Sequence, residues 1–167
     1  MDLDRLKHSY SVAKKMQEIG KKMNLSEKEM EALFVIGLNH DIGYEFAPDG
    51  KNHAKIGGEI LRENGFEYWK EVYYHGSLQD EYHSKFLDIL NCADMQIDKH
   101  GEDVGFKKRL EDIKSRYYEK QPEVYRKCCD MVKYYSDFEK SLDNDITKWY
   151  IKNQCVRLYW QKHLFRI

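Results

Sequence analysis

The sequence predicts an all-α protein made of one helical domain and a C-terminal helical extension. Apolar residues recur at helical spacing along almost all of the 167 residues. Only two prolines interrupt the chain, and its ten glycines are scattered rather than clustered, so long helices are favoured over a turn-rich β architecture. A hydrophobic content of 41% with 34% charged residues is ordinary for a globular domain that buries a core.

Two helices are predicted at the start of the chain. The first has an apolar stripe at steps of four, four, three and four residues, made of His8, Val12, Met16, Ile19 and Met23. His8 therefore lies on a face that the core should bury. The second helix begins at a capping box at residues 26–29 and continues to His40 and Asp41, where Gly43 can end it.

Three further helices follow. Asn52 can cap the first of them, and an Asn-Gly pair at 64–65 gives it a stop signal. A short helix is expected from about residue 67 to residue 75, and the next begins near residue 80. The apolar face of this last helix consists of Phe86, Leu87, Leu90, Asp94 and Ile97. Burying the Asp94 carboxylate there costs several kcal/mol unless a cation or a hydrogen-bond partner compensates it.

The character of the chain changes near residue 120, where we place a soft domain boundary. A charged amphipathic helix at 106–118 closes the predicted domain of residues 1–120. Residues 121–167 form an aromatic helical tail, with a last helix from about 145 to 164. We expect this tail to pack on the core or in a homodimer interface, which disfavours the alternative that its basic and aromatic residues bind nucleic acid.

Charge and composition exclude several classes of partner. A net charge of −1 gives no general attraction to nucleic acid or to an anionic membrane. The N-terminus lacks the apolar run of a signal peptide, and no stretch approaches the ~20 apolar residues that span a bilayer. The four cysteines form no CxxC pair, which is typical of a reducing compartment. We therefore expect a soluble cytoplasmic protein with no membrane partner.

Four groups suited to metal binding occur along the chain: His8, His40, Asp41 and Asp94. A single histidine or aspartate on an apolar helix face is more often a satisfied core residue than a ligand. The ordered set is much less easily explained by chance, because a shared divalent cation would compensate the buried carboxylate. Mixed nitrogen and oxygen ligands suit Fe, Mn, Zn or Mg in differing degrees, so the sequence does not name the ion.

Three segments resemble the HD superfamily of metal-dependent phosphohydrolases. Residues 5–13, RLKHSYSVA, look like its opening R-x-x-H helix. Residues 40–43 match its HDIG variant letter for letter, and the Cys-Ala-Asp of 92–94 resembles its closing aspartate. The similarity covers about residues 3–115. It implies an HD-domain helical bundle and hydrolysis of phosphate bonds with a divalent metal.

Carried over by position, the resemblance implies one divalent ion on four ligands: His8, His40, Asp41 and Asp94. His53 and His75 resemble the two additional histidines of a binuclear subset, in which the carboxylate of the HD pair bridges both ions. A surface or capping role is the alternative for each of these two histidines. The layout is similar to small HD hydrolases that split symmetrical dinucleoside tetraphosphates. Since the GYP portion of HD-GYP phosphodiesterases is missing, turnover of cyclic dinucleotides is disfavoured.

Asp41, Arg5 and Asp98 are the candidate catalytic residues. A divalent ion activates water for attack on phosphorus, so no nucleophilic side chain is needed, and no GxSxG or GxxxxGK[ST] pattern occurs. Arg5 lies one helical turn before His8 and can contact a phosphate, or else is an exposed arginine at a helix start. Asp98 can orient a ligand or a water, with a solvated carboxylate as the alternative. The remaining histidines, His83, His100 and His163, are expected at the surface.

The chain departs from the superfamily directly after HDIG, where many catalytic members carry a lysine that meets the substrate phosphate. Here Tyr44 and Glu45 follow, and neither brings a positive charge. Two functions therefore stay open. The first is hydrolysis of a phosphoester or phosphoanhydride in a phosphorylated small molecule such as a nucleotide. The alternative is a catalytically silent metal- or nucleotide-binding domain that acts as a sensor or recruits a partner.

Overall fold

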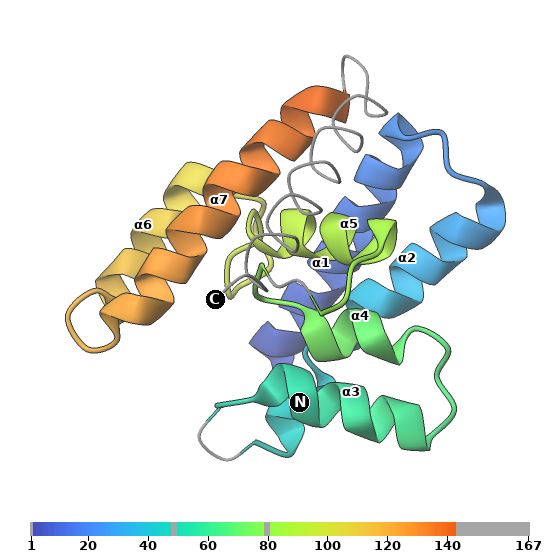
Figure 1. Cartoon of the computed structure of the whole chain (residues 1–167), viewed down its shortest axis with the longest axis horizontal. Helices are drawn as coiled ribbons and strands as arrows, with labels where there is room; N and C mark the ends of the chain where they lie inside the picture. The colour runs from blue at the N-terminus through green and yellow to red at the C-terminus, as the bar shows by residue number, and fades with distance from the viewer. Residues whose placement is uncertain (1, 48–49, 79–80, 143–167) are drawn as a thin grey trace, which may run out of the picture.

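The computed structural model describes residues 2–47, 50–78 and 81–142. In these residues the chain forms seven α-helices and one 3₁₀ helix, and no β-strand (Figure 1). In chain order they are α1 (Leu3–Lys22), α2 (Glu27–Asn39), η1 (Ile42–Glu45), α3 (His53–Glu63), α4 (Trp69–Tyr74), α5 (Lys85–Asp94), α6 (Gly105–Tyr117) and α7 (Pro122–Leu142). The all-α prediction is confirmed. The last predicted helix, at about 145–164, lies outside the described residues.

The second helix begins where the sequence predicts, and it packs against the first. The Asp2 side chain caps α1 by accepting from the Arg5 backbone N–H at 2.7 Å. Ser26 and Glu29 form the predicted capping box at the start of α2. The apolar stripe of α1 is buried, and His8 is buried with it. This pair of helices therefore carries the first predicted ligand into the interior.

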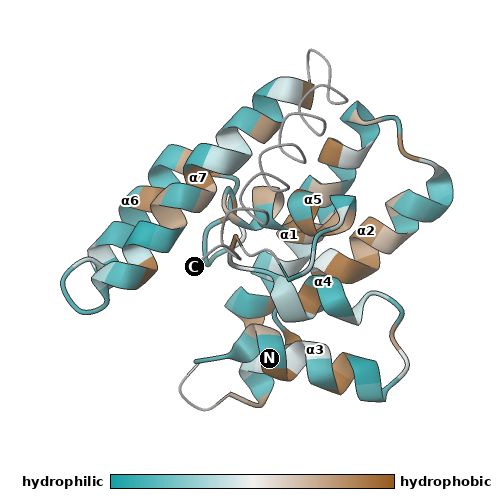
Figure 2. Cartoon of the chain, in the orientation of Figure 1, coloured by the Kyte–Doolittle hydropathy of each residue, from teal (hydrophilic) through white to brown (hydrophobic). Residues whose placement is uncertain are grey.

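The core lies where α1, α2 and α5 meet, and α7 covers α5. Hydrophobic residues gather on the central helices in Figure 2, whereas the visible faces of α6 and α7 are mostly hydrophilic. From α7, Met131, Tyr135 and Phe138 are buried in this core. The predicted division at residue 120 stays a prediction. None of the helices in the described ranges has the length and apolar composition that crossing a bilayer requires.

The fifth α-helix is shorter at both ends than the sequence predicts. It starts at Lys85, because the Ser84 hydroxyl accepts from the Leu87 backbone N–H at 3.0 Å and caps the helix. It ends at Asp94, and the following residues turn away to form an isolated bridge between Ile97 and Asp103. Asp94 is therefore a helix-end residue.

Gly43 allows η1 and α3 to approach each other backbone to backbone. A Cβ atom at Gly43 would lie 1.9 Å from the His53 carbonyl oxygen and 2.7 Å from the Gly57 amide nitrogen. Any side chain at position 43 would push α3 away. The glycine of the HDIG segment thus sets the separation between Asp41 and His53.

Candidate metal centre

The six predicted ligand residues come together at one place, from five segments of the chain. Most of them stand at helix ends: His40 and His75 are the C-caps of α2 and α4, His53 is the first residue of α3, and Asp94 is the last residue of α5. Only His8 comes from within a helix, one and a half turns into α1. Helix ends that converge in this way bring short side chains together while the helix bodies form the core.

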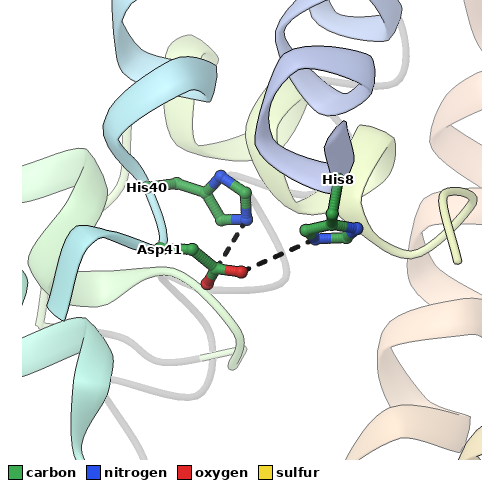
Figure 3. A group of neighbouring side chains, drawn as sticks. All are labelled: His8, His40 and Asp41. Carbon is green, nitrogen blue, oxygen red and sulfur yellow. Dashed lines mark ion pairs between the residues drawn. The ribbon is translucent and has the colours of Figure 1, made fainter. Parts of the chain in front are cut away.

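The Asp41 carboxylate is the centre of this group. Its Oδ1 atom lies 3.4 Å from His40 Nε2, 3.5 Å from His53 Nε2 and 3.7 Å from His75 Nε2. Its Oδ2 atom lies 3.7 Å from His8 Nε2, and Figure 3 shows His8 and His40 pointing toward this carboxylate. Two ligand atoms that share one ion at about 2.1 Å are roughly 3–3.5 Å apart. The separations are close to those that a metal requires.

Two overlapping half-sites can be distinguished. The inner half-site is His8, His40, Asp41 and Asp94, in which Asp94 Oδ1 lies 3.1 Å from His8 Nε2 and 4.0 Å from His40 Nε2. The outer half-site is Asp41, His53 and His75. In both the His8–His40–Asp41 group and the outer group, the ligand atoms lie within 4.8 Å of one another. Asp41 belongs to both half-sites.

The four imidazoles are oriented by backbone carbonyls. Each Nδ1 atom lies at hydrogen-bonding distance from a carbonyl oxygen: His8 to Asp98 (2.8 Å), His40 to Gly37 (2.7 Å), His53 to Gly50 (3.1 Å) and His75 to Val72 (2.6 Å). With Nδ1 as the donor, Nε2 of a neutral ring offers its lone pair toward the carboxylates. The buried His40 Nε2 has no hydrogen-bond partner. This donor set fits a divalent metal ion.

Electrostatics keep both carboxylates ionised. Burial alone would raise the pKa of Asp41, but His40, His75 and Arg5 outweigh burial and hold that pKa well below its usual value. The pKa of Asp94 is also lowered, because its contact with His8 outweighs burial. Burial lowers the pKa of His40 to about 4, so this imidazole is neutral at physiological pH. Burial lowers the pKa values of His8 and His75, but Asp94 and Asp41 respectively outweigh burial and raise them, so a metal ion would displace a proton from these two rings.

Arg5 lies at the centre, as the sequence predicts. Its Nη1 atom donates to Asp41 Oδ2 at 2.6 Å. Its guanidinium lies 3.9 Å from the centroid of the Tyr44 ring, and that ring stacks on His53 with 3.9 Å between centroids. Tyr44 therefore lies between Arg5 and His53. The residue that replaces the lysine of many superfamily members thus makes two contacts at this site.

Asp98 acts through its main chain rather than through its carboxylate. Because α5 ends at Asp94, Asp98 stands in the following turn and not on the predicted helix face. Its carbonyl oxygen orients His8, while its Oδ1 atom accepts from the backbone N–H groups of His100 and Glu102, each at 2.9 Å. The contact with the predicted ligand His8 is therefore made by the Asp98 peptide group.

Two of the histidines expected at the surface are in the described residues. His100 is exposed and pairs with the exposed Asp4. His83 is instead half-buried, and its Nε2 atom lies 2.7 Å from Oδ2 of the buried Asp88. The surface expectation is wrong for His83, because a buried carboxylate on α5 draws it inward. His163 lies outside the described residues.

Sequence reasoning missed the side of the site that α6 and α7 form. A cavity of 180 Å³ opens at the candidate metal centre, and Arg109, Arg116, Tyr117 and Cys128 line it together with the predicted ligands. Arg109 Nη2 lies 3.9 Å from Asp94 Oδ1. The sequence signal at 106–118 was only a charged amphipathic helix, and its spacing does not indicate which charges face the cavity.

Comparison with known proteins agrees with this geometry. A family model described as HD domain matches residues 5–130. The match includes all six predicted ligand residues, Arg5, the whole of α6 and the first part of α7. Searches of curated proteins and of solved structures found no match.

Proposed function

This chain belongs to the HD domain family, and we propose that it is a metal-dependent phosphohydrolase that cleaves a phosphoester or phosphoanhydride bond in a nucleotide or a similar small molecule. The observation that supports this most is the convergence of four imidazole Nε2 atoms on two ionised carboxylates beside a cavity. A purely structural cluster would leave the buried His40 Nε2 without a partner.

The inner half-site would hold one divalent ion, and the outer half-site would hold a second ion through Asp41, His53 and His75. Such an ion lowers the pKa of a coordinated water and draws charge from the phosphoryl oxygens. Four imidazole nitrogens favour Fe, Mn or Zn over Mg, which prefers oxygen ligands. The proposed cofactor is therefore one or two transition-metal ions.

The chain's own residues position the ligands and the substrate. Backbone carbonyls fix the ring planes of the histidines, so the ligands are oriented before an ion arrives. Arg5 uses one of the five guanidinium N–H donors on Asp41, and the others can donate to a phosphoryl oxygen in the cavity that Arg5 lines. Asp41 remains ionised throughout because of its lowered pKa.

A catalytically silent sensor is the second candidate function, and Tyr44 is the observation that favours it. Burial raises the pKa of Tyr44 to about 12, so its hydroxyl is neutral at physiological pH. At this position the side chain brings no charge to a substrate phosphate. A sensor would bind the metal and a nucleotide without turnover.

The test is a panel of nucleotides and generic phosphoesters, each assayed with Mn, Fe, Zn and Mg, on wild-type protein and on Asp41→Ala. Metal content is measured by mass spectrometry, and folding by circular dichroism. The matched control is Asp130→Ala, which removes an exposed carboxylate from α7. Turnover that Asp41→Ala abolishes without unfolding, and that the control retains, supports the hydrolase. Absence of turnover with every metal supports the sensor.

A further inference from the structure

A cleft leads outward from the metal centre between the ligand side and α6. The 180 Å³ cavity at the centre adjoins a second cavity of 580 Å³. The two share six lining residues: Arg5, Tyr44, His53, Arg116, Tyr117 and Val124. Together they fall within the roughly 300–1,000 Å³ of small-molecule sites. Figure 1 shows α6 beside α7 as a hairpin, so the far side of the cleft is built by a separate helical pair.

The cleft is strongly cationic in the part of the chain that the structure describes. Four cationic side chains line the inner cavity, namely Arg5, Lys99, Arg109 and Arg116. The carboxylates of Asp41 and Asp94 oppose them there. A divalent ion on those carboxylates would leave the cationic side chains in excess. Such a field would favour an anionic ligand.

Arg109 and Arg116 are fixed by a single shared carboxylate. Asp112 Oδ2 lies 3.4 Å from Arg109 Nη1 and 2.6 Å from Arg116 Nη2. The Arg109 side chain is only 13% exposed, and its buried Nε atom has no hydrogen-bond partner. Burying a guanidinium this incompletely satisfied costs free energy, which an anion in the cavity would offset. Asp112 therefore positions both arginines, while the Nε donor of Arg109 is left without an acceptor.

The positive groups are arranged in order along the cleft. Arg109 lines only the inner cavity, Arg5 and Arg116 line both cavities, and Lys51 lines only the outer one. A single phosphate occupies one point of such a row, whereas a chain of phosphates can follow it. Because the positive charge extends beyond the metal centre, the cleft fits a chain of phosphates better than a single phosphate.

We propose that Arg109 and Arg116 bind the phosphates that lie beyond the cleaved bond, so that the substrate is an oligophosphate with at least two phosphates, such as a nucleoside di- or triphosphate. This inference rests on the proposed function and narrows its substrate class. The two arginines would also supply the positive charge that the Tyr44 side chain does not bring to a substrate phosphate. Asp112 acts only as a positioning residue.

The test compares two non-hydrolysable probes that differ by one phosphoryl group, methylphosphonate and methylenediphosphonate. Their binding is measured by titration calorimetry, once with EDTA and once with Mn²⁺ in large excess over the probe. Wild-type protein is expected to prefer the diphosphonate by about tenfold or more, since each charge-assisted hydrogen bond contributes on that scale. Arg116→Gln should remove most of this preference and leave methylphosphonate binding within about twofold.

Arg126→Gln is the matched control, because it removes one exposed arginine from α7 outside the cleft. Arg109→Gln is a second variant, whose fold is checked by thermal melting. Equal affinity of wild type for both probes in both conditions, or an Arg116→Gln that behaves like the control, overturns the inference. Because binding is read without turnover, a protein that prefers the diphosphonate but hydrolyses nothing contradicts the hydrolase and not the oligophosphate subsite.

Discussion

The two half-sites share Asp41 but are built in different ways. The inner half-site takes its side chains from the core helices α1, α2 and α5, and His8 and His40 are buried. The outer half-site takes the buried His75 from the end of α4 and His53 from the start of α3, and the His53 side chain is 25% exposed. His53 is oriented by the Gly50 carbonyl and follows Asn52, whose φ of +58° is in the left-handed region.

This difference shows that one ligand cluster can combine a half-site fixed by the core helices with a half-site that depends on a few local contacts. The inner ligands move only if the core moves, because their helices form it. The outer ligand His53 depends on local contacts: the Gly43 approach and the Tyr44 stack. We therefore expect the inner ion to bind more tightly, and the following variants test this ranking.

The largest effect is expected from His8→Ala, which removes the imidazole that lies between Asp41 and Asp94. Loss of a direct ligand should lower kcat by more than the roughly 100-fold that supporting groups contribute. Bound metal per chain, measured by mass spectrometry, should fall in parallel. The control is His100→Ala, which removes an exposed histidine. Near-normal metal content and activity in His8→Ala would show that the inner half-site does not bind its ion more tightly than the outer one.

His53→Ala is expected to separate the two half-sites. It should remove the outer ion and keep the inner one, and because the inner ion stays, kcat should fall less than in His8→Ala, by about 10- to 100-fold. The measurement is again metal stoichiometry together with kcat. Loss of both ions would mean that the half-sites bind as one unit, which contradicts the comparison.

The inner half-site was the easier of the two to predict from sequence. His8 and Asp94 stand out because they interrupt apolar stripes, and burial of a charged or polar group in such a stripe needs a partner. Arg5 was predictable for a similarly local reason, since one helical turn separates it from His8. Helix periodicity also predicted the all-α fold, with errors mainly at helix ends, as at α5.

Sequence could not predict contacts that depend on how distant helices pack. Arg109 faces Asp94 only because the chain turns back after α5, and no spacing rule indicates that turn. The sequence names Asp98 but not the atom that contacts His8, because a carbonyl acceptor is independent of residue type. His83 was misassigned because its partner Asp88 reads as an ordinary helix residue.

Gly43→Ala should weaken the outer half-site without touching a ligand. The added methyl group overlaps the His53 carbonyl, so α3 must shift, at a cost of about 1–3 kcal/mol in the free energy of unfolding. The outer ion should be bound more weakly and kcat should fall by up to about tenfold, while the inner ion is kept. Urea unfolding and metal stoichiometry measure the two effects. Unchanged stability would mean that η1 and α3 do not approach this closely in solution.

The smallest effect is expected at Tyr44, where the ring and the hydroxyl can be tested separately. Tyr44→Leu removes the stack on His53 and the contact with Arg5, which are each of the order of 1 kcal/mol, so the outer ion should bind about three- to tenfold more weakly. Tyr44→Phe keeps the ring and should bind both ions as wild type does. If Tyr44→Phe binds the outer ion as weakly as Tyr44→Leu does, the hydroxyl supports ion binding. Stacking of the ring on His53 would then not stabilise the outer half-site.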